Sequence, residues 1–313
     1  MILKRNLSPL KIWQYTKGQM WFVIVWSVAV WALFYFTGQK SLAISFTPIG
    51  VLGSALAIFV AFRNNSAYGR WWEARTLWGS IINNSRILAR QLIANADNAA
   101  ATGKASPETV AAFKNEMVYR QIAFAHALRL HLRKQESWNE ISHLLGQTEY
   151  EALSTKQNKP NLLLLTQGNR IKEAMRQEIL GPFDNISMEP TLAGFNNFQG
   201  ACERIKNTPL PKQYDFFTRV FVWVFSFLLP FGMLSLFAGD ARLAWLIIPL
   251  SIIVSGVFVI MERTGAANED PFENKVTDVP MTTMCNTIER DLKEMLGGVD
   301  LPAKIEAENG YLM

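Results

Sequence analysis

Apolar residues are concentrated in four uncharged stretches of the chain, which fall into two pairs. The stretches cover residues 18–39, 41–62, 220–239 and 243–261. Each is close to the ~20 residues that an α-helix needs to cross the hydrocarbon core of a bilayer. Short connections around 38–41 and 239–242 join the two members of each pair. The pattern therefore predicts two transmembrane helical hairpins.

Basic residues flank these stretches unevenly, and the asymmetry predicts their orientation. Lys4, Arg5, Lys11 and Lys17 precede the first stretch, Arg63, Arg70 and Arg75 follow the second, and Lys40 lies between the two. Flanks that are rich in lysine and arginine stay in the cytoplasm. We expect both termini and the large region between the hairpins to be cytoplasmic.

The remaining sequence has the spacing of helices, with no strand pattern and no internal repeat, so we expect an all-α protein. From about 57 to 97 a helical spacing continues without proline, which predicts one helix that runs from the membrane into the cytoplasm. Further helices are expected over 107–133, 137–146, 148–154, 161–180, 189–205 and 281–296. The last is amphipathic, and either lies on the surface or packs around a neighbouring subunit.

These elements divide the chain into four parts. They are an N-terminal segment with the first hairpin (1–62), a cytosolic helical region (63–212), the second hairpin (213–262) and a cytosolic tail (263–313). Half of the residues are apolar and 18% are charged, below the roughly 25% usual in soluble proteins. The net charge of +5 arises from basic residues beside the membrane stretches, so nucleic-acid binding receives little weight.

Few residues in the chain could hold a metal or a cofactor. Cys202 and Cys285 lie in predicted cytoplasmic regions, where thiols stay reduced. Two cysteines and three histidines are too few for a metal site, and we expect no cofactor. An enzyme would need a nucleophile and a base, but no motif supports His126, His131 or His143 in such a role. We therefore expect a protein that is not an enzyme.

Arginine, asparagine and tryptophan gather where the second apolar stretch ends, in the segment 63–90. Trp71, Arg75 and Trp78 share one helical face, and Arg70 and Glu73 are spaced to pair. A belt of aromatic residues at the membrane interface accounts for the tryptophans alone. Polar residues continue at 83–86, however, and buried polar groups need partners. Packing of this helix against copies of itself would supply them.

Four pieces of the sequence together resemble the signature of the bacterial branch of the bestrophin family. They are Thr47-Pro48-Ile49; a run containing Phe62, Arg63, Asn64, Asn65, Ala67, Tyr68, Arg70, Trp71, Trp72, Glu73, Ala74, Arg75, Leu77, Trp78 and Gly79; 201–205 (ACERI) with 208–211 (TPLP); and Glu269-Asp270-Pro271-Phe272. The resemblance implies a pentameric ion channel in the bacterial inner (plasma) membrane. Each subunit would contribute four membrane helices to an assembly with one central pore.

The resemblance also implies a narrow neck on the second membrane helix, formed at i, i+4 and i+8 by Thr47, Val51 and Ala55. Small or polar residues there would weaken gating by dewetting. Alternatively, larger side chains on a neighbouring track, Ile58 and Phe62, form the constriction. Close helix packing is the other explanation for small residues such as Ala55.

A second constriction is implied at the cytosolic end of the pore, by one apolar residue after a proline. Phe183 is the candidate and Ile179 the alternative. Without the family, either would more often be a core residue. Nearby charges are mixed: Glu178, Asp184 and Glu189 against Arg170, Lys172 and Arg176. We expect small monovalent ions to pass, with sodium favoured on family grounds alone; a chloride channel and a non-conducting scaffold are the alternatives.

Eukaryotic members bind calcium through consecutive acidic residues after the fourth span. Here the segment reads Glu269-Asp270-Pro271-Phe272-Glu273-Asn274-Lys275, which offers few carboxylates beside a lysine. Calcium takes six to eight oxygen ligands, so we expect no activation by calcium. We expect Asp270 and Glu273 to accept backbone hydrogen bonds and order the loop.

Overall fold

The computed structural model describes residues 1–4, 9–237, 239–240 and 242–312, so Arg5 lies outside the described residues. The described chain is helical, which confirms the all-α prediction. Its α-helices are α1 (Pro9–Thr37), α2 (Phe46–Ala101), α3 (Pro107–Arg133), α4 (Gln147–Ser154), α5 (Lys159–Arg176), α6 (Asp184–Asn207), α7 (Lys212–Phe237), α8 (Ile247–Asn268) and α9 (Met281–Met295); short 3-10 turns lie at Lys40–Leu42, Trp138–Leu144 and Ala244–Leu246. The chain divides into two compact units, which we describe separately.

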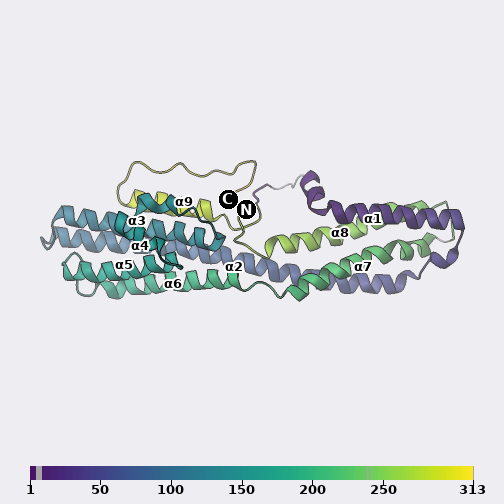
Figure 1. Ribbon diagram of the computed structural model, residues 1–313, viewed down its shortest axis with the longest axis horizontal. Helices are drawn as coiled ribbons and strands as arrows, with labels where there is room; N and C mark the ends of the chain where they lie inside the picture. The colour runs from purple at the N-terminus through teal and green to yellow at the C-terminus, as the bar shows by residue number, and fades with distance from the viewer. Residues whose placement is uncertain (5–8, 238, 241, 313) are drawn as a thin grey trace. The chain divides into compact units, whose positions relative to one another are not determined.

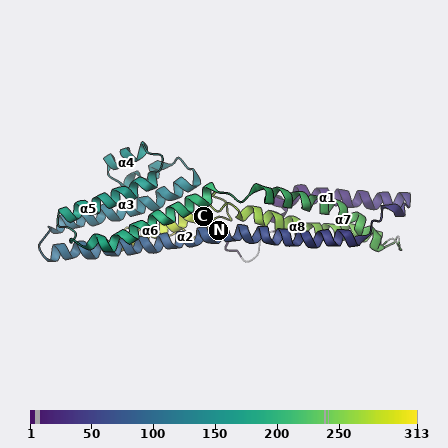
Figure 2. The same cartoon turned by 90° about the horizontal axis from the view of Figure 1, so that it is seen from below.

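The membrane unit comprises residues 4–71 and 209–270. Within it α1, α7, α8 and the first part of α2 run side by side (Figures 1 and 2). Four described helices are long and apolar enough to cross a bilayer, as the sequence predicts. The protein is thus a multi-pass membrane protein. The helices extend beyond the apolar stretches, because polar turns such as the one that contains Asp215 continue them.

Large side chains and glycines interlock in the core of the membrane unit. Phe225 and Leu229 of α7 are buried together with Leu56 of α2. A Cβ atom on Gly53 would lie 2.9 Å from a ring carbon of Phe225, and one on Gly232 would lie 2.6 Å from Cδ1 of Ile49. At Gly53 the small residue therefore serves close helix packing.

The polar unit comprises residues 1–3, 72–208 and 271–313, and α3 lies at its centre. Helix α3 begins and ends as predicted, because Ser106 caps its first turn by accepting from the Thr109 amide at 3.2 Å and Pro107 follows. Helix α9 buries its apolar face on α3, and the Cys285 thiol donates to the Ala125 carbonyl at 3.4 Å. Packing against α3 of the same chain therefore explains the amphipathic pattern of α9.

The helices around Phe183 and the two chain ends differ from the prediction. Helix α5 ends at Arg176, before a turn in which Glu178 takes a left-handed conformation at φ 57°. Helix α6 begins at Asp184, five residues early, since this carboxylate accepts from the Gly181 amide at 2.7 Å. The N-terminal and C-terminal segments of the chain contact each other, because the Leu3 amide donates to the Gly310 carbonyl at 2.9 Å. The hydrophobic periodicity of the sequence does not predict this contact.

Candidate functional site

One face of α2 in the membrane unit is left bare by the neighbouring helices. Val51, Ile58 and Phe62 are 66%, 58% and 70% exposed, and Thr47 and Ala55 are exposed with them. The opposite face is buried through Ile49, Leu56 and Val60. Positions i, i+4, i+8, i+11 and i+15 share one helical face because the helix has 3.6 residues per turn. We call these five exposed residues the α2 strip.

The α2 strip contains both sets of residues that the sequence offers for the neck. Ile58 and Phe62 do not lie on a separate track from Thr47, Val51 and Ala55, because all five lie on the same exposed face. The two candidate constrictions are therefore successive levels of one surface. Ser54 is also exposed near this face, and its hydroxyl donates to the Gly50 carbonyl at 3.0 Å.

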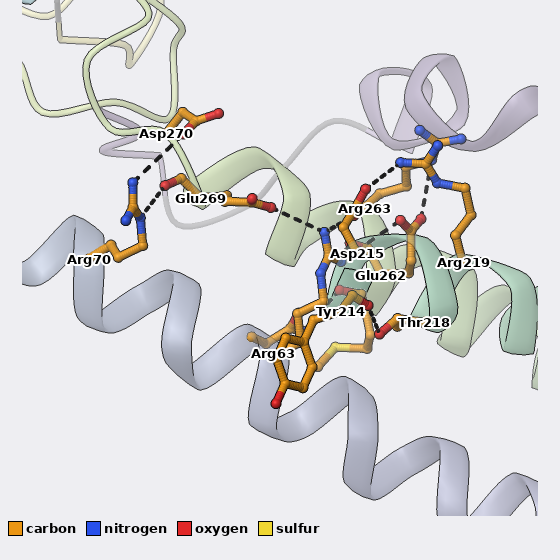
Figure 3. A network of polar contacts seen from close by, with 12 residues as sticks. Arg63, Arg70, Tyr214, Asp215, Thr218, Arg219, Glu262, Arg263, Glu269 and Asp270 are labelled. Atoms are coloured by element: carbon orange, nitrogen blue, oxygen red, sulfur yellow. Dashed lines mark hydrogen bonds and ion pairs between the residues drawn. The ribbon is translucent and has the colours of Figure 1, made fainter. Parts of the chain in front are cut away.

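The residue that follows the strip, Arg63, points away from it, into the membrane unit. It is 5% exposed, and Figure 3 shows its guanidinium between α7 and α8. Nη2 donates to the carboxylate of Asp215, and Nη1 donates to the main-chain carbonyl of Glu262 at 2.9 Å. Nη2 also lies 3.5 Å from a carboxylate oxygen of Glu269. We call Arg63 and the carboxylates of Asp215, Glu262 and Glu269 the Arg63 cluster.

Three further arginines border the Arg63 cluster. Arg219 contacts Asp215 at 2.7 Å, and Nε of Arg263 lies 3.5 Å from Glu262. Arg70 donates to the main-chain carbonyl of Glu269 at 2.9 Å and lies 3.9 Å from the carboxylate of Asp270 (Figure 3). Burial raises the pKa of Glu269, and Arg63 is the strongest influence that opposes this rise.

Sequence reasoning found Arg63 and Arg70 but missed Asp215 and Glu262. These two acids lie about 150 and 200 positions further along the chain, so no local pattern connects them with Arg63. One signal was available, since an ionisable residue at the end of an apolar span is costly unless it has a partner. Helices α2 and α8 approach closely at Gly265 of α8. A Cβ atom at this position would lie 2.0 Å from Oδ1 of Asn64 in α2.

The tryptophan-rich block is divided between burial and exposure. Trp78 is 0% exposed and belongs to the core of the polar unit, so it is not available to a neighbouring subunit. Tyr68 and Trp72 are 52% and 56% exposed. Glu73 pairs with Arg204 of α6, whereas Arg70 contacts Glu269 and Asp270. The structure thus leaves Tyr68 and Trp72, but not Trp78, as candidates for contacts between subunits.

Two of the polar residues at 83–86, Ser85 and Arg86, find partners within their own chain rather than from other copies. The Gln121 amide donates to the buried hydroxyl of Ser85 at 2.8 Å, and the Gln167 amide donates to Gln121 at 2.9 Å. Arg86 pairs with Asp291 of α9. Helices α3, α5 and α9 therefore satisfy these groups.

The two candidates for the cytosolic constriction differ in exposure. Phe183 is 75% exposed just before α6, whereas Ile179 is 0% exposed and is a core residue. Ile186, 65% exposed, lies one helical turn after Phe183 and was not predicted. Nearby, Arg170 pairs with Glu116 and Arg176 with Glu173, each at 2.9 Å. Phe183 is the candidate that the structure leaves accessible.

The loop after α8 is ordered differently from the prediction. Asp270 faces Arg70, and Glu273 pairs with Lys206. Asp278, which was not predicted, accepts from the Lys275 amide at 3.1 Å and so orders the loop. Pro271 and Phe272 are buried. No group of three or more histidine, cysteine, aspartate or glutamate residues among the described positions is arranged to hold a metal ion.

The two histidines of α3 lie beside carboxylates of neighbouring helices. Nε2 of His126 lies 3.4 Å from Glu289 of α9, and Nε2 of His131 lies 3.4 Å from Glu203 of α6. The neighbouring side chains of His126 and then Lys293 lower the pKa of Glu289 to about 2. Cys202 and Cys285 are free and buried, and burial raises the pKa of each thiol to about 12.

Known proteins resemble this chain over most of its length. A family model described as Bacterial/Fungal Bestrophin protein matches residues 11–294. The voltage-dependent anion channel-forming protein YneE of Escherichia coli K12 is 32% identical over 289 residues, which are 92% of this chain and 88% of that protein. A voltage-dependent anion channel-forming protein of Ralstonia nicotianae is 31% identical over 81% of this chain and 78% of its own.

Solved structures agree in fold. The crystal structure of a bacterial bestrophin homolog from Klebsiella pneumoniae matches with a TM-score of 0.79 at 28% identity, and covers 90% of this chain and 99% of that one. A crystal structure of a mutant of the same homolog gives the same score, identity and coverage. The likeness therefore extends through both units.

Proposed function

The chain belongs to the family of bacterial and fungal bestrophins, and on this basis we propose that it is the subunit of a passive ion channel. The observation that carries the proposal is the α2 strip, a continuous exposed face within a membrane span. In a monomer surrounded by lipid, the hydroxyl of Thr47 would face hydrocarbon, which costs free energy. When several subunits surround a central axis, the same face of α2 in each subunit lines a pore.

We propose that five copies assemble around this axis, with both termini in the cytoplasm and the protein in the inner membrane. The family resemblance supports the number five, and the basic flanks support the orientation. Tyr68 and Trp72 extend the exposed surface of α2 and fit contacts between subunits. Counting subunits by single-molecule bleaching in nanodiscs tests the stoichiometry, and a monomer would overturn the proposal.

We propose that the channel passes anions such as chloride. Relatives named as anion channel-forming proteins support this alternative better than they support the expectation of sodium. The α2 strip is uncharged, so it contains no carboxylate that would repel an anion. A cation channel remains the second candidate, because Glu178 and Glu189 are exposed near Phe183.

The deciding experiment is a reversal potential across a gradient of sodium chloride, with purified protein in planar bilayers. An anion channel reverses near the equilibrium potential of chloride, and a cation channel reverses with the opposite sign. A reversal near the sodium potential would overturn anion selectivity. Electrically silent assemblies of the correct subunit number would overturn the channel itself and favour the scaffold.

A further inference from the structure

The polar unit contains a cavity of about 390 Å³ that is lined mainly by polar and charged residues. Its wall combines the C-terminal ends of α3 and α6 with the first turn of α5, and it includes Lys134, Lys159 and Lys206. Glu203, also in the wall, belongs to the segment 201–205, for which the α2 strip gives no role. Cavities of roughly 300–1,000 Å³ are the size that holds small-molecule ligands.

The two carboxylates of the cavity wall already have hydrogen-bond donors. Oε1 of Glu203 accepts from Nδ2 of Asn158 at 3.0 Å and from Nε2 of Gln199 at 2.8 Å. Oε2 of Glu136 accepts from the indole N–H of Trp138 at 3.1 Å. Because neutral donors satisfy both carboxylates, neither requires a bound cation.

Two lysines of the same wall have no carboxylate partner. Lys206 pairs with Glu273 at 2.5 Å, but Lys134 and Lys159 form no ion pair with any residue that the structure describes. Nζ of Lys159 lies 4.3 Å from the centre of the Trp138 ring, a contact that orients the ammonium group and leaves its charge in place. The cavity therefore offers two positive charges to an anion.

Lys134 occupies a backbone position that ordinarily favours glycine. It ends α3 in the left-handed conformation, with φ 52° and ψ 42°, where a side chain costs free energy and glycine does not. Its main-chain amide donates to the His131 carbonyl at 3.2 Å, as the amide of a glycine could equally do. The geometry of the helix end therefore does not explain a lysine here, whereas an ammonium group in the wall of an anion site does.

The wall also contains acceptors that lack donors. Oε1 of Gln135 is buried and accepts no hydrogen bond from the residues that the structure describes. Both hydrogen bonds to the Glu203 carboxylate reach Oε1, so among described residues Oε2 has no donor. Buried acceptors are ordinarily satisfied. Hydroxyl groups on a ligand would supply the missing donors.

We propose that this cavity binds a small hydroxylated anion. Its phosphate or carboxylate group contacts Lys134 and Lys159, and its hydroxyl groups donate to Gln135 and Glu203. Sugar phosphates and sugar acids share this chemistry. The site is independent of ion conduction, because every residue that forms it belongs to the polar unit.

Isothermal titration calorimetry of the full-length protein in lipid nanodiscs tests the site with glucose 6-phosphate, gluconate, inorganic phosphate and glucose. At about 0.15 M salt, which screens exposed charges, at least one of the two hydroxylated anions should bind more tightly than inorganic phosphate, and glucose should not bind. The tighter of the two identifies the anionic group. If neither gives a saturable heat below about 10 mM, the site is refuted. Inorganic phosphate that binds as tightly as both would refute the role of the hydroxyl groups.

Substitutions locate the binding. Lys134→Gln and Lys159→Gln should each weaken binding roughly 10-fold or more, as the loss of a hydrogen bond to a charged group does. Lys156→Gln is the matched control, because Lys156 is an exposed lysine just before α5 that does not line the cavity, and it should bind as the wild type does.

Lys134→Gly separates binding from folding, because it removes the ammonium group and relieves the left-handed backbone. It should bind as weakly as Lys134→Gln without a lower melting temperature. Binding that survives both substitutions of Lys134, or that Lys156→Gln weakens equally, would overturn the proposal.

Discussion

Replacing Glu289 with glutamine should loosen the contact of α9 with α3. Nε2 of His126 lies 3.4 Å and Nζ of Lys293 2.7 Å from the Glu289 carboxylate, which is 13% exposed. The pKa of Glu289 falls from the usual 4.5 to about 2. At 1.36 kcal/mol per pKa unit this shift corresponds to at most roughly 3.4 kcal/mol. Solvent around the exposed edge reduces the expected contribution to about 1–2 kcal/mol.

The sign of the pH dependence follows from the lowered pKa. Because the folded value lies below the unfolded one, the stabilisation is complete above the ordinary pKa of glutamate and is lost as the pH falls from about 4.5 toward about 2. Hydrogen exchange of the α9 amides reports the local opening that this pair restrains. At neutral pH, Glu289→Gln should speed exchange by roughly 5–30-fold, the factor that 1–2 kcal/mol gives.

Glu294→Gln is the matched control, because Glu294 is exposed on the same helix. It should leave the exchange of α9 unchanged. A double-mutant cycle with His126→Leu isolates the pair from Lys293, and the coupling energy should account for most of the loss. Equal exchange in Glu289→Gln and Glu294→Gln, or a coupling energy near zero, would refute the assignment of this pair as the restraint on α9.

Three further predictions concern the pore face, the candidate constriction and the helix crossing. Ala55→Phe should reduce single-channel conductance without changing the melting temperature, because Ala55 is exposed; a melting shift with unchanged conductance would show that this face is packed in the assembly. Phe183→Ala should raise conductance, whereas Ile179→Ala should lower the free energy of unfolding by about 2–5 kcal/mol, since Ile179 is 0% exposed; the reverse pattern in the two assays would exchange their roles. Gly265→Ala should destabilise the membrane unit by about 1–3 kcal/mol, because its Cβ would meet Oδ1 of Asn64 at 2.0 Å and Nη1 of Arg63 at 3.3 Å; unchanged denaturation of the detergent-solubilised protein would contradict this.

The sequence predicted those helix bounds that depend on residues near the helix ends. The start of α3 followed from Pro107 with Glu108 in the first turn, and the continuation of α2 beyond the apolar stretch followed from the helical spacing without proline between about 57 and 97. The start of α6 was missed because it depends on one contact from Asp184 to Gly181.

Helical periodicity made the exposed face of α2 predictable. The partners of buried polar residues were not predictable, because they come from distant parts of the sequence. The α2 strip follows from helical spacing, and its five residues were named, although in two groups. Ser85 was expected to need a partner, but the partner Gln121 comes from α3 of the same chain. Glu262 was passed over because a single glutamate after an apolar stretch looks like the end of a span; its burial depends on Arg63, which lies 199 positions away.

The division of the polar unit among three separate stretches of chain has a consequence for biosynthesis. Residues 1–3, 72–208 and 271–313 form this unit, and the second membrane hairpin lies between the last two stretches. During synthesis α3 is made before its partner α9, so the surface that Met284, Ile288 and Leu292 cover stays open until the hairpin at 209–270 has been made. Exposed apolar surface of this kind is prone to aggregation and is a substrate for chaperones. A ribosome stalled within α8 should therefore present an unfinished polar unit, and release of the last 43 residues should complete it.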